Sequence, residues 1–293
     1  MKAGIHVFAG PSLPRAARAG YEKFAFHGPA AQGDVYRLTA SRPRAIAIVD
    51  GYFERTAAVW HNEILWALAQ GIHVFGAASM GALRAAELAP FGMLGVGRIF
   101  EAFANGSLTD DDEVTIVHAD ETWDFRAGSE AMVNIRATLR AALDAGVVAA
   151  HEHDALVAAA KRTFYPDRSY PALLAAAERE LSPSSAARVA SWLGARENHV
   201  DQKRSDGLEL LASLARERGR LAEPLCVPWT FRHTDAWEQV RATFARERRP
   251  KKARGARVDA RAPRVALSSQ RGAHPRNDLA QDVSTRRLDD FRT

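Results

Sequence analysis

The chain is organised around Gly71-Ile72-His73-Val74-Phe75-Gly76-Ala77-Ala78-Ser79-Met80-Gly81-Ala82-Leu83-Arg84-Ala85-Ala86-Glu87-Leu88. Its first five residues are a short apolar run with β-branched side chains, which predicts a buried strand. Its last seven residues are rich in alanine and leucine, which favour a helix. The small residues from Gly76 to Ser79 therefore predict a tight turn that joins the strand to the helix.

Ser79 falls at the N-terminus of this predicted helix, where free N–H groups and the positive end of the helix dipole favour an anion. The string Ala77-Ala78-Ser79-Met80-Gly81 is similar to the turn that carries the nucleophile of serine hydrolases, with alanine in place of the first glycine. We therefore consider Ser79 as a nucleophile beside an oxyanion site. The alternative is that Ser79 only caps the helix.

The rest of the N-terminal region alternates strands with helices. Gly4-Ile5-His6-Val7-Phe8 repeats the Gly71–Phe75 string, and it leads to Ser12 as the other leads to Ser79. Further strands are predicted at 23–26, 44–49 and 114–118, and helices at 33–39, 57–70 and 95–104. This alternation predicts an α/β fold with a small doubly wound parallel sheet.

From Ser129 onward the pattern is helical. We expect helices at 129–145, 151–163, 170–181, 182–193 and 201–218, and a last packed segment around Trp229 and Trp237. The expected organisation is an α/β core at 1–125, a mostly α-helical part packed on it at 126–244, and a tail at 245–293.

The net charge of +5 is unevenly distributed. Residues 246–293 contain 14 Lys and Arg against 6 Asp and Glu, whereas the preceding residues contain 26 against 29. The tail lacks apolar periodicity, so we expect it to be disordered, basic and removable. The basic charge therefore does not mark a folded nucleic-acid-binding face, and we expect no nucleic-acid partner.

A single cysteine, Cys226, excludes an internal disulfide and a cysteine metal cluster. No apolar run approaches the length of a signal peptide or a membrane span, so we expect a cytoplasmic protein without a membrane partner. No glycine-rich phosphate-binding motif occurs, and we expect no cofactor. The acidic run 110–113 is either a hard-cation site or, more commonly, a solvated loop; we expect no metal there.

Parallel strands end at one edge of the sheet, and ligands bind along that edge. The candidate catalytic residues there are Ser79, Asp50, His27 and Lys203. As the base that would activate Ser79, the sequence leaves three groups open: His27, His118 and a buried Lys203. Arg84 either pairs with Glu87 or binds a carboxylate. The candidate substrate-binding residues are Gly10, Ser12, Glu63, Met80, Gly81 and Arg84.

The Gly76–Leu88 string also resembles the signature of TfuA-like proteins. Other pieces agree in order over roughly residues 5–211: Gly10-Pro11-Ser12-Leu13, Asp50-Gly51-Tyr52-Phe53, Glu63-Ile64-Leu65, Gly92-Met93, Asp111-Asp112-Glu113-Val114, Val133-Asn134-Ile135-Arg136 and Val200-Asp201-Gln202-Lys203. The basic tail has no counterpart in this signature.

The resemblance implies a role beside YcaO-type enzymes in the maturation of ribosomally made peptides, where the pair is associated with backbone thioamides. It implies that this chain hydrolyses a thiocarboxylated sulfur-carrier protein and so supplies sulfide. A YcaO-type enzyme, the carrier and a precursor peptide are then the expected partners. The alternative is a non-catalytic adaptor that docks a YcaO enzyme and presents its substrate. An ordinary serine esterase fits less well, because no obvious histidine is placed late in the chain after an aspartate, the usual order on that fold.

Overall fold

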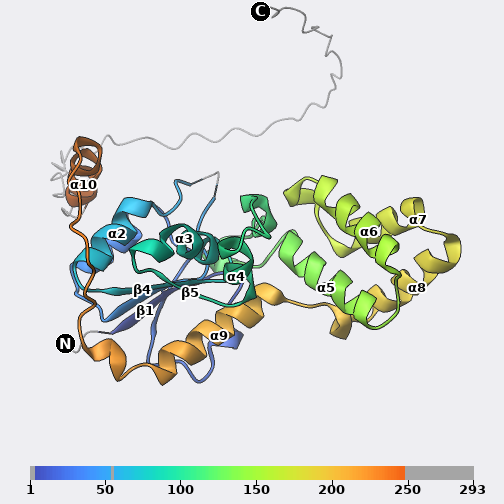
Figure 1. Cartoon of the computed structure of the whole chain (residues 1–293), viewed down its shortest axis with the longest axis horizontal. Coiled ribbons are helices and arrows are strands. Elements are labelled where there is room, and N and C mark those ends of the chain that lie inside the picture. Colours follow the sequence, from blue (N-terminus) through green and yellow to red (C-terminus); the bar gives the residue numbers. More distant parts are fainter. Residues whose placement is uncertain (1–3, 54–55, 248–293) are drawn as a thin grey trace, which may run out of the picture. The chain divides into compact units, whose positions relative to one another are not determined.

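The computed structural model of the protein describes residues 4–53 and 56–247 (Figure 1). Five strands form one parallel sheet in the order β2-β1-β3-β4-β5. They are β1 Ile5–Phe8, β2 Ala25–His27, β3 Ala45–Ile48, β4 His73–Ala77 and β5 Leu94–Val96. The strands predicted around Gly4, Phe24, Ile46 and Ile72 are thus confirmed as parallel neighbours.

The two copies of the Gly-Ile-His-Val-Phe string form β1 and β4, which pair with opposite edges of β3. Phe8 of β1 lies opposite Ile48 of β3, and Ile48 lies opposite Gly76 of β4. Because the carboxyl ends of the three strands are level, the turns that follow them meet at one edge of the sheet.

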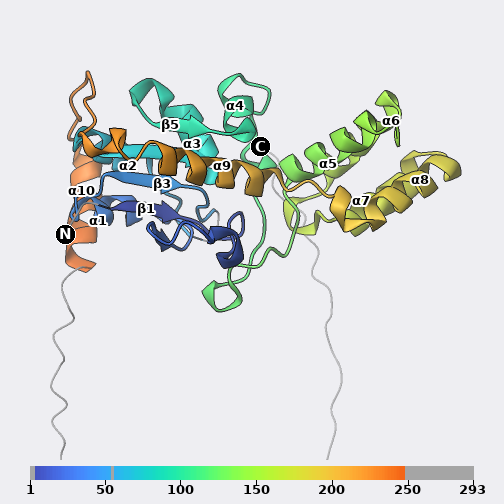
Figure 2. The same ribbon diagram turned by 90° about the horizontal axis from the view of Figure 1, so that it is seen from below.

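Helices cover both faces of the sheet. One face packs against α1 Asp34–Thr39, α2 His61–Ala69 and α3 Met80–Leu88. The other face is covered by α9 Gln202–Arg216, whose Leu210, Leu211 and Leu214 are fully buried. Figure 2 shows α9 running across the strands. The sheet is therefore completed by a helix more than 100 residues further along the chain.

The predicted C-terminal helices are confirmed. α5 Met132–Asp144, α6 Ala150–Arg162, α7 Tyr170–Glu180 and α8 Pro183–Gly194 share a separate core around Leu139, Leu156 and Val189. α10 Asp235–Glu247 contributes Trp237, which is fully buried among Tyr36, Trp60, Trp66 and Phe231. The division into parts at 1–125 and 126–244 stays a prediction.

Two predictions of local structure were wrong. The segment 95–104 begins with β5, and the helix α4 occupies only Arg98–Ala104. The β-branched run 114–118 is not a sheet strand, because its partners lie in the following loop. Val117 N–H donates to Ser129 Oγ at 2.9 Å, and its carbonyl accepts from Gly128 N–H at 2.7 Å. This run instead lines the cleft described below.

Within the described residues, no helix combines the length and the apolar character that crossing a membrane requires. The predicted disordered tail falls, beyond Glu247, outside the described residues.

Candidate functional site

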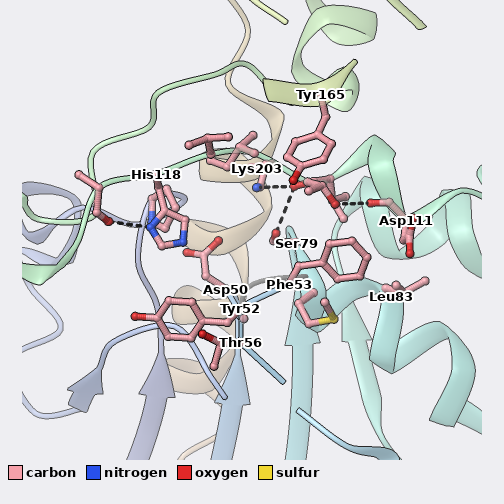
Figure 3. Close-up of a pocket in the computed structure, with 18 of the residues that line it drawn as sticks. Asp50, Tyr52, Phe53, Thr56, Ser79, Leu83, Asp111, His118, Tyr165 and Lys203 are labelled. Carbon is pink, nitrogen blue, oxygen red and sulfur yellow. Dashed lines mark hydrogen bonds between the residues drawn. The ribbon is translucent and has the colours of Figure 1, made fainter. Parts of the chain in front are cut away.

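A cleft of about 280 Å³ lies at the carboxyl edge of the sheet (Figure 3). Asp50 follows β3, Ser79 lies between β4 and α3, and Lys203 comes from the first turn of α9. These three residues, predicted from sequence, line the cleft together. Its other walls come from Tyr52, Phe53 and the 111–120 segment.

Ser79 does not act as a helix cap. Its hydroxyl makes no capping hydrogen bond and instead donates to the Val114 carbonyl, with an oxygen–oxygen distance of 3.4 Å. The preceding residue, Ala78, has φ = 65°, a left-handed conformation that costs free energy for a residue with a side chain. The sharp turn that this conformation produces brings the Ser79 hydroxyl to the cleft.

Lys203 is buried, with 3% of its surface exposed. Its Nζ donates to the same Val114 carbonyl at 2.8 Å, so one oxygen atom binds both the Ser79 hydroxyl and the Lys203 amine. Burial holds the pKa of the Lys203 ammonium below its usual value, whereas the negative charges of Asp50, Asp201 and Glu130 act in the opposite direction. A lysine with a lowered pKa is suited to accept a proton.

Asp50 is fixed by the turn that follows β1. Its Oδ2 accepts the N–H groups of Gly10 and Ser12 at 2.8 and 3.0 Å, and its Oδ1 accepts the Ser12 hydroxyl at 2.6 Å. Gly10 and Ser12, predicted as substrate-binding residues, therefore orient Asp50. The carboxylate in turn favours the charged form of Lys203.

The acidic run next to Val114 forms an ion-pair network. Lys161 of α6 binds Asp110, Asp112 and Glu113 together. Arg136 of α5 binds both oxygens of Glu113 at 2.9 Å, and buried Arg168 binds the carboxylate and the carbonyl of Asp112. Although these three carboxylates are close enough together for a metal ion, the Lys161 ammonium occupies that position. The run is therefore only partly the solvated loop expected: Asp110 and Asp111 are exposed, whereas Asp112 and Glu113 are held by basic side chains.

Three pieces of sequence that are far apart meet at this network. Glu113 pairs with Arg136, and the Val114 carbonyl accepts a hydrogen bond from Lys203 Nζ. Asn134 Oδ1 accepts the backbone N–H of Lys203 at 3.1 Å. Sequence reasoning missed the Val114 carbonyl and Asn134. One signal in the sequence could have indicated that these segments meet, because three of the pieces that carry the family resemblance are Asp111–Val114, Val133–Arg136 and Val200–Lys203.

His118 also lines the cleft. Its Nδ1 lies 2.7 Å from the Ala119 carbonyl, which only accepts hydrogen bonds, so the proton of the neutral ring is on Nδ1. In Figure 3 the side chain of Asp50 lies between His118 and Ser79. Lys203 shares a hydrogen-bond acceptor with Ser79, and we therefore favour Lys203 over His118 as the base.

Two predicted site residues lie elsewhere. His27 packs on His6, with Nε2 2.9 Å from the His6 Nδ1, and it lines a separate cavity with Arg15 and Arg18. Glu63 is fully buried and accepts the N–H groups of Gly33, Tyr36 and Trp60, so it holds the starts of α1 and α2 together. Neither residue lines the Ser79 cleft. His27 ends strand β2 and Glu63 lies in the first turn of α2, but the side chains of both residues point into other parts of the fold.

The remaining predicted residues are divided between the cleft and the scaffold. Met80 lines the cleft. Arg84 donates to Glu87 at 2.7 Å and to the Val59 carbonyl at 3.1 Å, which favours the structural alternative for this residue. Gly81 allows α3 to approach β3 so closely that an added Cβ would lie 1.7 Å from the Ile48 carbonyl oxygen.

Gly81→Ala is expected to lower the free energy of unfolding by about 3 kcal/mol or more, because the new methyl group meets backbone atoms that cannot rotate away. Urea denaturation measures this loss. Gly194→Ala is the matched control, because a Cβ at Gly194 meets nothing within 4 Å. Equal stability of the Gly81→Ala variant and the wild-type protein would contradict the packing role.

Residues 50–169 match the family described as TfuA-like protein. Over this range the chain is similar to TfuA-like proteins. The match confirms the resemblance and includes Asp50, Ser79, Val114 and His118, whereas Ser12 and Lys203 lie outside the matched range. No curated protein matches the chain significantly. The TfuA-like segment thus supplies most of the cleft, and α9 adds Lys203 to it.

Proposed function

We propose that this protein is an accessory protein of peptide thioamidation that hydrolyses a thiocarboxylated sulfur-carrier protein and supplies sulfide to a YcaO-type enzyme. The family match supports the accessory role. The observation that carries the hydrolytic step is the shared binding of Ser79 Oγ and Lys203 Nζ to the Val114 carbonyl in a cleft at the edge of the sheet.

In the first step, Ser79 Oγ attacks the thiocarboxylate carbon and gives its proton to neutral Lys203. The Met80 N–H finds no acceptor among the described residues, and it lies at the positive end of α3. It is therefore suited to stabilise the oxyanion that forms on the carbonyl oxygen. As the C–S bond breaks, the Lys203 ammonium gives its proton to the departing sulfur, so that HS⁻ leaves, Ser79 carries an ester and Lys203 is neutral again.

In the second step, water attacks the Ser79 ester while Lys203 accepts its proton. Cleavage of the C–O bond returns a proton to Ser79 Oγ and releases the carrier with an ordinary carboxylate. The net reaction consumes one thiocarboxylate and one water, and it yields one carboxylate, one HS⁻ and one proton. Asp50 lowers the cost of the transient Lys203 ammonium through its negative charge.

The isolated protein is expected to release sulfide from a thiocarboxylated carrier catalytically, without a YcaO enzyme or ATP. A colorimetric sulfide assay with the carrier alone as the background measures this activity. Release only when a YcaO enzyme is present, or no release above background, would contradict the hydrolase and favour the adaptor.

A further inference from the structure

We propose that a second cavity beside the Ser79 cleft binds the polypeptide segment that precedes the carrier's thiocarboxylate, and that Arg126 and Arg196 at its rim bind acidic residues of the carrier. This inference rests on the proposed function, because it names the binding surface for the same substrate.

The second cavity has a volume of about 670 Å³, more than twice that of the Ser79 cleft. Pro11, Ile116 and Lys203 line both spaces, so the two cavities meet at the proposed base. A protein terminus advances about 3.3 Å per extended residue. The cleft therefore holds only the last residues of a carrier, and the residues before them must lie in an adjoining space.

The walls of the second cavity suit a peptide. Trp123 and Tyr170 offer aromatic surface, whereas the polar side chains of Asn134 and Ser129 in the walls are already hydrogen-bonded within the protein. Trp123 is 67% exposed, the largest exposure among the large hydrophobic side chains of the described residues. Its loop is fixed by buried Phe125 and by the Asp120 carboxylate, which accepts the Thr122 N–H at 3.0 Å. Exposed tryptophan on a fixed loop is typical of binding surfaces.

The charges at the rim indicate an acidic partner. Arg126 and Arg196 are exposed and form no ion pair with any described residue, whereas Arg204 beside them pairs with Asp201 at 3.5 Å. Unpaired guanidinium groups are suited to bind carboxylates through two hydrogen bonds. Another cavity, which shares Phe53 and Thr115 with the cleft, differs because its basic side chains are already paired with acidic residues; these are Lys161, Arg162 and Arg168.

The test measures binding of the unmodified carrier, labelled with a fluorophore away from its C-terminus, by fluorescence anisotropy. The double variant Arg126→Glu/Arg196→Glu is expected to raise the Kd at least tenfold, because two attractive charges become repulsive. Arg179→Glu is the matched control, an exposed arginine on α7 that lines none of the cavities described. This control is expected to bind the carrier like the wild-type protein.

With thiocarboxylated carrier, the double variant is expected to raise the KM by a similar factor. Binding of the carrier by wild-type protein without sulfide release would contradict the hydrolase, while the loss of binding in the double variant would still support the rim. Equal Kd values for the double variant and the control, or no binding of the carrier by the wild-type protein, would overturn the inference.

Discussion

Ser79→Ala is expected to lower sulfide release from a thiocarboxylated carrier by about three orders of magnitude or more, because the loss of a nucleophile removes the covalent route. Its thermal stability should change little. The hydroxyl makes one long hydrogen bond, at 3.4 Å, and does not cap α3. Single-turnover kinetics and thermal melting of the same preparation measure the two effects.

Ser182→Ala is the matched control for Ser79. Ser182 caps α8 by accepting the Ser185 N–H at 3.2 Å, and it lies outside the cleft. Loss of this cap should cost about 1 kcal/mol of stability and leave sulfide release unchanged. If Ser79→Ala instead melts at a lower temperature and retains the wild-type rate, Ser79 is a structural residue and a water molecule is the nucleophile.

Lys203→Met is expected to lower the rate by about two to four orders of magnitude, the usual contribution of a general base. Methionine keeps much of the apolar stem but accepts no proton. In the wild-type protein only neutral Lys203 is active, so the rate should rise with pH and reach its plateau below the usual lysine pKa, because burial lowers the pKa of Lys203. The pH profile of kcat measures this titration.

Lys203→Arg separates a proton acceptor from a fixed positive charge. Arginine keeps the charge at every accessible pH, so it stabilises an anion but does not accept a proton. This variant is expected to be as inactive as Lys203→Met, and neither variant should show the titration of the wild-type protein. Substantial activity of Lys203→Arg would assign an electrostatic role to Lys203.

The sheet could be predicted from sequence because the repeated Gly-Ile-His-Val-Phe string and the buried runs between helices mark parallel strands. The run 114–118 has the same β-branched character, and only its tertiary partners, Ser129 and Gly128, show that it is not a strand. The short strand β5 was not predicted, because its only apolar side chains, Leu94 and Val96, alternate with Gly95 and Gly97 and so form no apolar run.

The site could be predicted where a residue follows directly from a strand or begins a helix, as for Asp50 and Ser79. His27 shows the limit of that reasoning, because the end of a strand does not tell which way a side chain points. The Val114 carbonyl could not be predicted, because a backbone acceptor has no sequence signature. Lys203 reaches the cleft only because α9 packs on the sheet.

Covalent catalysis by Ser79 is tested by the intact mass of the protein after rapid mixing with thiocarboxylated carrier and an acid quench. A transient adduct is expected, equal in mass to the two proteins together minus H₂S, with the carrier's C-terminal carbonyl attached to Ser79 in peptide mapping. The adduct should be absent in Ser79→Ala and should persist longer when hydrolysis is slowed at low pH. Rapid sulfide release by the wild-type protein without any adduct at Ser79 would contradict the role of Ser79 as the nucleophile.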